Sequence, residues 1–138
     1  MMNSKRITTP QKRLDEFIKI LDSLNNLDCP VVVEGKRDTS ALKNIGYSGT
    51  IIELNDGRSL LSTVESLAQK LGTSGKFVIM TDWDRTGGRL AKQLKEYGES
   101  IDLHPDLTIR RNLALLFSKD ISCIEELPSA IRTLNLQT

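Results

Sequence analysis

The feature that most constrains this chain is a regular alternation between short apolar runs and longer segments with helical periodicity. The apolar runs, rich in β-branched residues, cover Val31–Val33, Thr50–Leu54, Phe77–Met80 and, more weakly, Ile101–Leu103. Short runs that are apolar throughout are typical of strands buried on both faces of a parallel sheet. The alternation therefore predicts an α/β fold, a Rossmann-like parallel sheet of about four strands flanked by helices.

Helical segments precede, separate and follow these runs. Thr9 and Pro10 are a suitable N-cap and first residue for an N-terminal helix over residues 10–26. Within the core, helical periodicity covers residues 38–44, 60–71 and 90–97, and a glycine follows each segment (Gly46, Gly72 and Gly98). We expect these glycines to end the helices in the left-handed conformation.

The length of 138 residues is suited to one hydrophobic core. We expect a single domain over residues 1–138, with a core at about 29–104 and further helices at about 106–136. The net charge of +1, from 19 basic and 18 acidic residues, does not by itself indicate a polyanionic partner. Any contact with nucleic acid must therefore come from local clusters of basic residues.

The cysteines and the N-terminal segment exclude several other classes of protein. Cys29 and Cys123 are isolated and His104 is the single histidine, so neither a zinc site nor a disulfide framework is indicated. The first ten residues lack the apolar segment of a signal peptide, and no apolar run has membrane-spanning length. We expect a cytoplasmic protein without a membrane partner.

Three carboxylates follow two of the predicted strands. Glu34 comes directly after the first, and Asp82 and Asp84 follow the third. Ligands of open parallel sheets bind at the carboxyl ends of strands, so the three carboxylates converge if these two strands are neighbours. Carboxylates that share a small volume need a counter-charge, and Mg²⁺ fits this donor set, with Mn²⁺ as the alternative.

Glycines and basic residues surround these carboxylates. Gly35 and Gly87 are expected loop residues ahead of helix starts, where backbone N–H groups can approach an anion. Asp38 is expected to cap the short helix that follows it. The basic residues of the two segments, which we expect to contact nucleic acid, are Lys36, Arg37, Arg85, Arg89 and Lys92.

The order strand–EGKRD–βα unit–strand–DWDRTG resembles the Toprim domain of topoisomerases, bacterial-type primases and maturases related to ribonuclease M5. That pattern has a glutamate after the first strand and a DxD with a nearby glycine after the third. Glu34, Asp82, Asp84 and Gly87 occupy these positions. The resemblance implies that Glu34 handles a proton and is a further metal ligand, that Asp82 and Asp84 hold Mg²⁺, and that Lys36 and Arg85 contact phosphate oxygens. Lys36 is thereby a second candidate catalytic residue.

Two functions are compatible with this resemblance, and a third interpretation does not depend on it. The first is a metal-dependent nuclease or related phosphoryl-transfer enzyme, with RNA favoured over DNA. The second is a binding subunit that does not cut and that joins a protein partner in an RNA- or DNA-processing complex. A third interpretation treats DWDRT as the DxDxT loop of aspartate phosphatases, which normally follows the first strand rather than the third.

Three further features have two interpretations each. Trp83 is either a packing residue, which we favour, or a platform for a base. Arg110 and Arg111 either extend a binding track or occupy a solvated face, and we favour the latter. Asn55 and Arg58 could reach the rim of the site, although a turn and a helix start account for them fully.

Overall fold

The computed structural model describes residues 9–138, so the start of the chain, on which the signal-peptide argument depends, lies outside this range. The described residues contain one four-stranded sheet in the order β2-β1-β3-β4, and every pair of neighbours is parallel. The strands are β1 (Val31–Val33), β2 (Ile51–Glu53), β3 (Lys76–Ile79) and β4 (His104–Asp106). The predicted α/β fold with a parallel sheet is confirmed.

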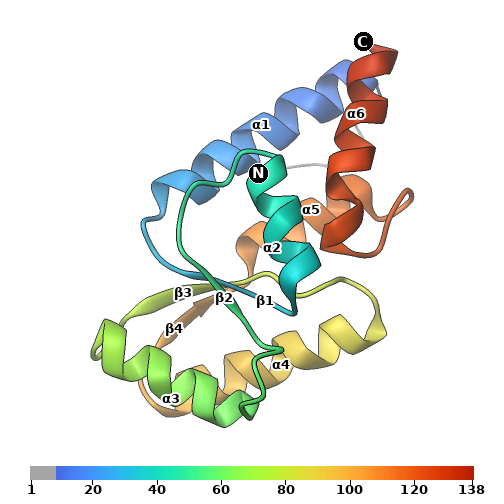
Figure 1. Ribbon diagram of the computed structural model, residues 1–138. Coiled ribbons are helices and arrows are strands. Elements are labelled where there is room, and N and C mark those ends of the chain that lie inside the picture. Colours follow the sequence, from blue (N-terminus) through green and yellow to red (C-terminus); the bar gives the residue numbers. More distant parts are fainter. Residues whose placement is uncertain (1–8) are drawn as a thin grey trace.

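Helices cover both faces of this sheet (Figure 1). One face carries α1 (Pro10–Asn26), α2 (Lys36–Asn44), α5 (Thr108–Phe117) and α6 (Leu127–Gln137), and the other carries α3 (Leu60–Leu71) and α4 (Arg85–Ser100). A short 3₁₀-helix, η2 (Ile124–Glu126), precedes α6. No helix in the described range is long and apolar enough to span a membrane.

The packing of β1 explains why all three of its residues are apolar. Val31 and Val33 pack into the core beneath α1, α2, α5 and α6, whereas Val32 packs into the second core beneath α3 and α4. All three side chains are fully buried. Successive residues of a strand point to opposite faces, so a central strand covered by helices on both sides needs an apolar residue at every position.

The last strand lies three residues later than the sequence predicted. Ile101–Leu103 forms the turn that leads into β4, with Asp102 at a φ of 63°, and only Leu103 is fully buried there. β4 itself contains Pro105, which a sheet tolerates because β4 is an edge strand. The apolar run Ile101–Leu103 therefore reflects the burial of Leu103 in a turn and not a strand.

Two of the three expected glycine caps are confirmed. Gly46 and Gly72 follow α2 and α3 with φ values of 109° and 77°. Gly98, in contrast, lies inside α4, where a Cβ would come 3.1 Å from the Phe77 ring. This glycine permits α4 to lie close against β3, so the expectation that it ends a helix is wrong.

Candidate metal and nucleic-acid site

The site lies where β1 and β3 end, and these two strands are direct neighbours. Glu34 follows β1, and its Oε2 accepts a hydrogen bond from the backbone N–H of Asp82 at 2.8 Å. The side chain that follows β1 thus bonds the backbone that follows β3, although the two residues are 48 positions apart in the sequence. The parallel order of the sheet brings Glu34 and Asp82 together as expected.

Asp82 is the central carboxylate of this edge. Its Oδ1 accepts a hydrogen bond from the Ile124 N–H at 2.7 Å, which places it in contact with the segment before α6. Burial raises the pKa of Asp82 to about 6; the Ile124 N–H opposes this shift, while the negative charges of Glu34 and Asp84 add to it. Burial and neighbouring acids thus both disfavour the charged form of Asp82.

Asp84 has a different position from Asp82. It is the N-cap of α4, and its Oδ1 accepts a hydrogen bond from the Gly87 N–H at 2.7 Å while the residue stays exposed. Each of the three carboxylates thus already accepts one backbone N–H. Within residues 9–138, no three histidine, cysteine or acidic side chains already have an arrangement that could hold a metal.

The two glycines and Asp38 lie at helix starts. Gly35 is the N-cap of α2, and its N–H donates to Asp38 Oδ2 at 3.1 Å, so Asp38 caps from inside the first turn rather than ahead of it. Gly87 lies in the first turn of α4, and a Cβ there would be only 1.9 Å from the Asp82 carbonyl oxygen. The N–H groups of both glycines have acceptors within the chain, and Gly87, expected ahead of the helix, lies inside it.

The expected basic residues flank the carboxylates from both faces of the sheet. All five are exposed, with Lys36 and Arg37 in the first turn of α2 and Arg85, Arg89 and Lys92 along α4. Because α2 and α4 cover opposite faces, their first turns enclose the ends of β1 and β3 (Figure 1). Within the described residues, the one ion pair that involves this set joins Arg37 to Glu125 at 4.0 Å.

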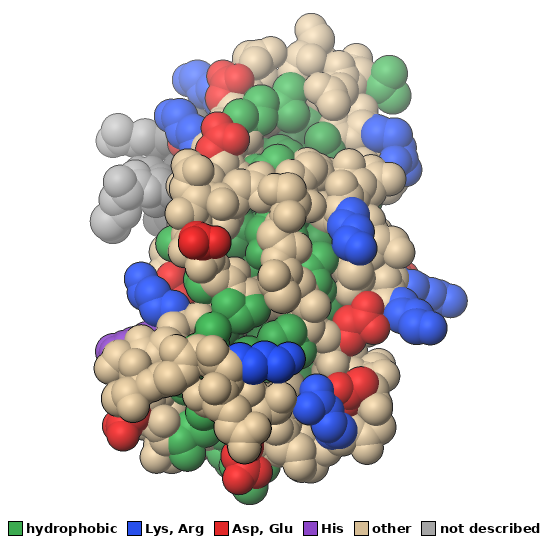
Figure 2. All heavy atoms as spheres, turned by 60° about the vertical axis from the view of Figure 1, so that its left-hand side comes forward, with side chains coloured by type: hydrophobic (Ala, Val, Ile, Leu, Met, Phe, Trp, Pro, Cys, Tyr) green, Lys and Arg blue, Asp and Glu red, His purple; other side chains and the backbone are tan. Residues whose placement is uncertain are grey.

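Another face of the molecule has a different distribution of charge. Figure 2 shows the view obtained when the left-hand side of Figure 1, where α1 ends, is turned forward. Acidic and basic side chains are interspersed there, with apolar side chains exposed between them. No single sign of charge dominates this face.

Arg110 is a site residue that sequence reasoning missed. Its Nε donates to the Thr81 carbonyl oxygen at 3.0 Å, and its Nη2 donates to the Asp82 carbonyl oxygen at 2.6 Å. Burial lowers the pKa of Arg110, against the effect of Asp82, Glu34 and Asp84, whose charges lie near enough to favour the cation. The solvated-face interpretation is therefore wrong for Arg110. No local pattern could have revealed it, because both acceptors are backbone atoms of the loop that follows β3.

Residues 121–124 form a wall of the site, although the sequence predicted only a helical arm. The Trp83 backbone N–H donates to the Ser122 carbonyl oxygen at 3.0 Å, and Trp83 Nε1–H donates to the Ile121 carbonyl oxygen at 2.8 Å. The indole also packs against the core beneath α1. The packing interpretation of Trp83 is confirmed, and the segment before α6 fixes the loop that carries Asp82.

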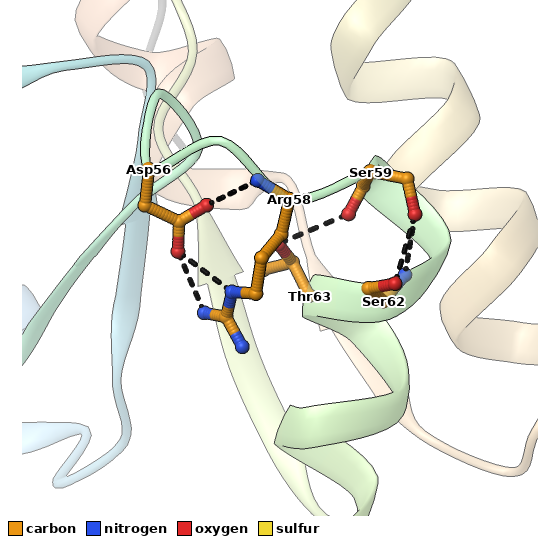
Figure 3. Close-up of polar contacts among 5 residues, drawn as sticks. All are labelled: Asp56, Arg58, Ser59, Ser62 and Thr63. Atoms are coloured by element: carbon orange, nitrogen blue, oxygen red, sulfur yellow. Dashed lines mark hydrogen bonds and ion pairs between the residues drawn. The ribbon is translucent and has the colours of Figure 1, made fainter.

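The loop between β2 and α3 contributes little to this site. Arg58 bonds Asp56 within the loop, while Ser59 caps α3 through the Ser62 N–H (Figure 3). Asn55 comes nearer, because its N–H donates to the Glu34 carbonyl oxygen at 3.0 Å. Of the two candidates for the rim, Asn55 therefore adjoins the site and Arg58 is engaged elsewhere.

Comparison with known proteins agrees with this arrangement. The family model of the Toprim domain matches residues 29–113. A UPF0292 protein of Methanosarcina barkeri is 38% identical over 127 residues, which cover 92% of this chain and 86% of the relative. A UPF0292 protein of Pyrococcus furiosus is 36% identical over 124 residues, covering 89% of each chain.

A solved structure of an Aquifex aeolicus protein is also similar to this chain. It superposes with a TM-score of 0.65 at 26% sequence identity, over 80% of this chain and 96% of that one. The parallel sheet and the contact between Glu34 and Asp82 are consistent with the family match. The chain therefore belongs to the Toprim domain family, together with the small archaeal UPF0292 proteins.

Proposed function

We propose that this protein binds Mg²⁺ and RNA at the ends of β1 and β3 and cleaves phosphodiester bonds there. Toprim membership indicates a metal-dependent function connected with nucleic acids. The observation that carries the finer proposal is the hydrogen bond between Glu34 Oε2 and the Asp82 N–H, because it joins an acidic side chain to the loop of the DxD motif. A proton-handling group and a metal-holding group then act on one phosphate.

The donor set fits a divalent cation in its chemistry. None of the ion pairs found among residues 9–138 involves Glu34, Asp82 or Asp84, and Asp82 has a pKa of about 6 because of burial and neighbouring charge. Hard carboxylate oxygens are the ligands that Mg²⁺ prefers, with Mn²⁺ as the alternative. Asp82 Oδ2 and Asp84 Oδ2, which are not bonded to a backbone N–H, would hold the ion, and Glu34 Oε1 would stay free to handle a proton beside it.

The residues then have distinct roles. Bound Mg²⁺ would neutralise charge on the phosphate oxygens. Glu34 would accept or return the proton of a hydroxyl or water at Oε1, since Oε2 is already engaged with the Asp82 N–H. Lys36 and Arg85, at the first positions of α2 and α4, would contact phosphate oxygens beside the site.

The remaining basic residues would position the nucleic acid. Arg37 on α2 and Arg89 and Lys92 on α4 are exposed and flank the carboxylates from the two faces of the sheet. Such contacts give affinity without sequence readout, and they make binding salt-dependent. RNA is favoured over DNA through the resemblance to maturases of the ribonuclease M5 type.

A second candidate function is binding without cleavage, within a larger processing complex. The observation in its favour is that no three-ligand metal arrangement is already formed in the part of the chain that the structure describes. Asp84, in particular, already uses Oδ1 to cap α4. A partner or the nucleic acid itself would then have to complete the metal site.

One experiment separates these two candidates. End-labelled single-stranded and structured RNA and DNA are incubated with purified protein, in Mg²⁺ and in EDTA, and both retention and cleavage are measured. Glu34→Gln removes the proton-handling group, while the amide oxygen can still accept from the Asp82 N–H. Glu65→Gln is the matched control, because Glu65 is an exposed acid on α3.

Under the nuclease proposal, cleavage requires Mg²⁺, is lost in Glu34→Gln and persists in Glu65→Gln. Retention without cleavage by all three proteins would reject the nuclease and support the binding subunit. Retention of neither polymer would reject both candidates. Equal cleavage by Glu34→Gln would remove Glu34 from the catalytic role.

A further inference from the structure

A groove between α4 and α5 shares Lys92 and Arg110 with the site described above and extends beyond it. It has a volume of about 450 Å³ and lies where α4 and α5, which cover opposite faces of the sheet, approach each other. Gly88 and Ala91 on α4 and Ala114 on α5 supply small side chains along it. The groove is therefore recessed between the two helices.

The charged residues that line this groove all have the same sign. Lys92 and Lys95 come from α4, and Arg110 and Arg111 come from α5; none of the described residues that line it is acidic. Glu99, which lies 3.4 Å from Lys95, is the one acid paired with this set within residues 9–138. A chain with a net charge of +1 thus concentrates four cations along one groove.

Arg110 connects the groove to the carboxylate edge. The same guanidinium that lines the groove donates to the carbonyl oxygens of Thr81 and Asp82. Gly88, also in the groove, lies near it, since a Cβ there would be 4.0 Å from Arg110 Nη2. An anion that lay along the groove would therefore reach the loop that carries Asp82 at Arg110.

We propose that the α4–α5 groove is the track for one phosphodiester backbone of a single-stranded nucleic acid, which it leads to Glu34 and Asp82. This inference rests on the proposed function, because it assigns the path of the same substrate. Lys92, Lys95 and Arg111 contact successive phosphates, and Arg110 marks the end of the track beside the carboxylates. The charge complementarity between a polyanion and a groove lined by four cations carries the assignment.

A single strand fits this groove better than a duplex does. The recess between two helices admits one backbone, and positively charged grooves of this kind are the usual paths for single strands. Leu107 and Leu115 line the groove as well, and Leu115 is 46% exposed, so apolar surface is available to unpaired bases. No aromatic residue is among the described groove residues, so affinity should depend mainly on phosphate contacts and hence on salt.

The test is fluorescence anisotropy with labelled oligouridylate, oligothymidylate and a duplex, each about 20 nucleotides long, which exceeds the usual site of a small binding domain. Titrations run in EDTA, to prevent cleavage, from about 50 to about 200 mM salt. The variant is Lys95→Gln with Arg111→Gln, two exposed residues that have no role in the proposed catalytic site. Lys70→Gln is the control, because Lys70 is exposed on α3, which does not line the groove.

The groove proposal expects the double variant to bind single strands roughly twentyfold more weakly at about 100 mM salt, with a salt slope lower by about 1.4, since each phosphate contact on a single strand contributes about 0.7. Circular dichroism and thermal melting should match the wild type.

Single-strand binding equal in wild type and variant would overturn the groove and leave the proposed function standing. A wild type that retains no strand in EDTA would overturn the groove, and the proposed function would then be judged by the retention assay in Mg²⁺. A duplex bound more tightly than single strands, with the same loss in the variant, would overturn the single-strand assignment. Equal results with uridylate and thymidylate would support a track that reads phosphates alone.

Discussion

The loops that follow β2 and β3 contain similar residues and differ in how the charges are compensated. Both lie at carboxyl ends of parallel strands, contain aspartate, have an arginine in the loop or directly after it, and are followed by a helix with a side-chain N-cap. In the β2–α3 loop, Arg58 Nη2 lies 2.7 Å from Asp56 Oδ2, and its hydrogen bonds lower the pKa of Asp56 (Figure 3). In the β3–α4 loop, burial and neighbouring acids raise the pKa of Asp82.

The two loops differ in how far along the sequence the hydrogen-bond partners of their aspartates lie. Asp56 is compensated two residues away in the sequence, at the exposed surface, so the loop is complete by itself. Asp82 has partners 28, 42 and 48 positions away, and the one cation among them, Arg110, bonds the backbone carbonyl oxygen rather than the carboxylate. An acidic residue at a strand end is thus a candidate ligand when distant parts of the chain fix it and leave the charge for something else to balance.

The largest expected effect comes from Gly87, in the first turn of the helix that follows the β3–α4 loop. Gly87→Ala places a Cβ 1.9 Å from the Asp82 carbonyl oxygen, a backbone atom that can move only if the loop moves. We expect the free energy of unfolding to fall by more than about 3 kcal/mol, as overpacking against backbone can cause. Urea denaturation followed by circular dichroism measures it.

Gly57→Ala is the matched change in the β2–α3 loop. Gly57 has a φ of 87°, but no atom lies within 4 Å of the position that a Cβ would take, so the cost comes from backbone conformation alone. We expect a loss of about 1 kcal/mol. Equal losses at Gly57 and Gly87 would contradict the view that the β3–α4 loop is fixed by close packing on Asp82.

A smaller effect concerns the two aspartates and Mg²⁺. At a pH of about 8, a Mg²⁺ concentration about ten times the dissociation constant should stabilise the wild type by about 1.4 kcal/mol, since the ion binds the folded state. Asp82→Asn keeps an oxygen for the Ile124 N–H and removes the charge, so it should abolish this gain without lowering stability in EDTA. Asp56→Asn should keep the full gain. Thermal melts across a Mg²⁺ titration check both, and an undiminished gain in Asp82→Asn would remove it from the metal site.

The sequence was sufficient to predict the features that depend on short-range pattern. The burial of β1 on both faces produced an unbroken run of valines, and the parallel order placed Glu34 beside Asp82. Gly46 and Gly72 were recognisable as caps because a left-handed residue after a helix is a local requirement. These features leave a trace in neighbouring residues, which periodicity and turn chemistry can detect.

The remaining features depend on contacts between backbone atoms and distant side chains. Arg110 bonds the carbonyl oxygens of Thr81 and Asp82, and any residue type can supply a carbonyl oxygen, so no pattern near Thr81 marks the contact. Gly98 resembles a helix end although it serves close contact with Phe77. Pro105 concealed β4, because a proline is acceptable in a strand only at a sheet edge, and the edge is known only from the assembled sheet.

The smallest expected effect is the loss of one hydrogen bond of similar strength from each loop. Trp83→Phe removes the donor to the Ile121 carbonyl oxygen, and Ser59→Ala removes the N-cap of α3. Each should lower the free energy of unfolding by about 1 kcal/mol. Because the wild type has a single tryptophan, which the first variant lacks, circular dichroism rather than fluorescence should follow unfolding.

The two variants should differ in their response to Mg²⁺ although their stabilities agree. Trp83 holds residues 121–124, from which the Ile124 N–H reaches Asp82, so Trp83→Phe should weaken Mg²⁺ binding as well as folding. Ser59→Ala breaks a contact that ends within its own loop and helix, and its Mg²⁺ dependence should equal that of the wild type. An equal Mg²⁺ response in both variants would mean that the segment before α6 supports the fold without orienting Asp82, because the same loss of stability would then have no consequence at the carboxylates.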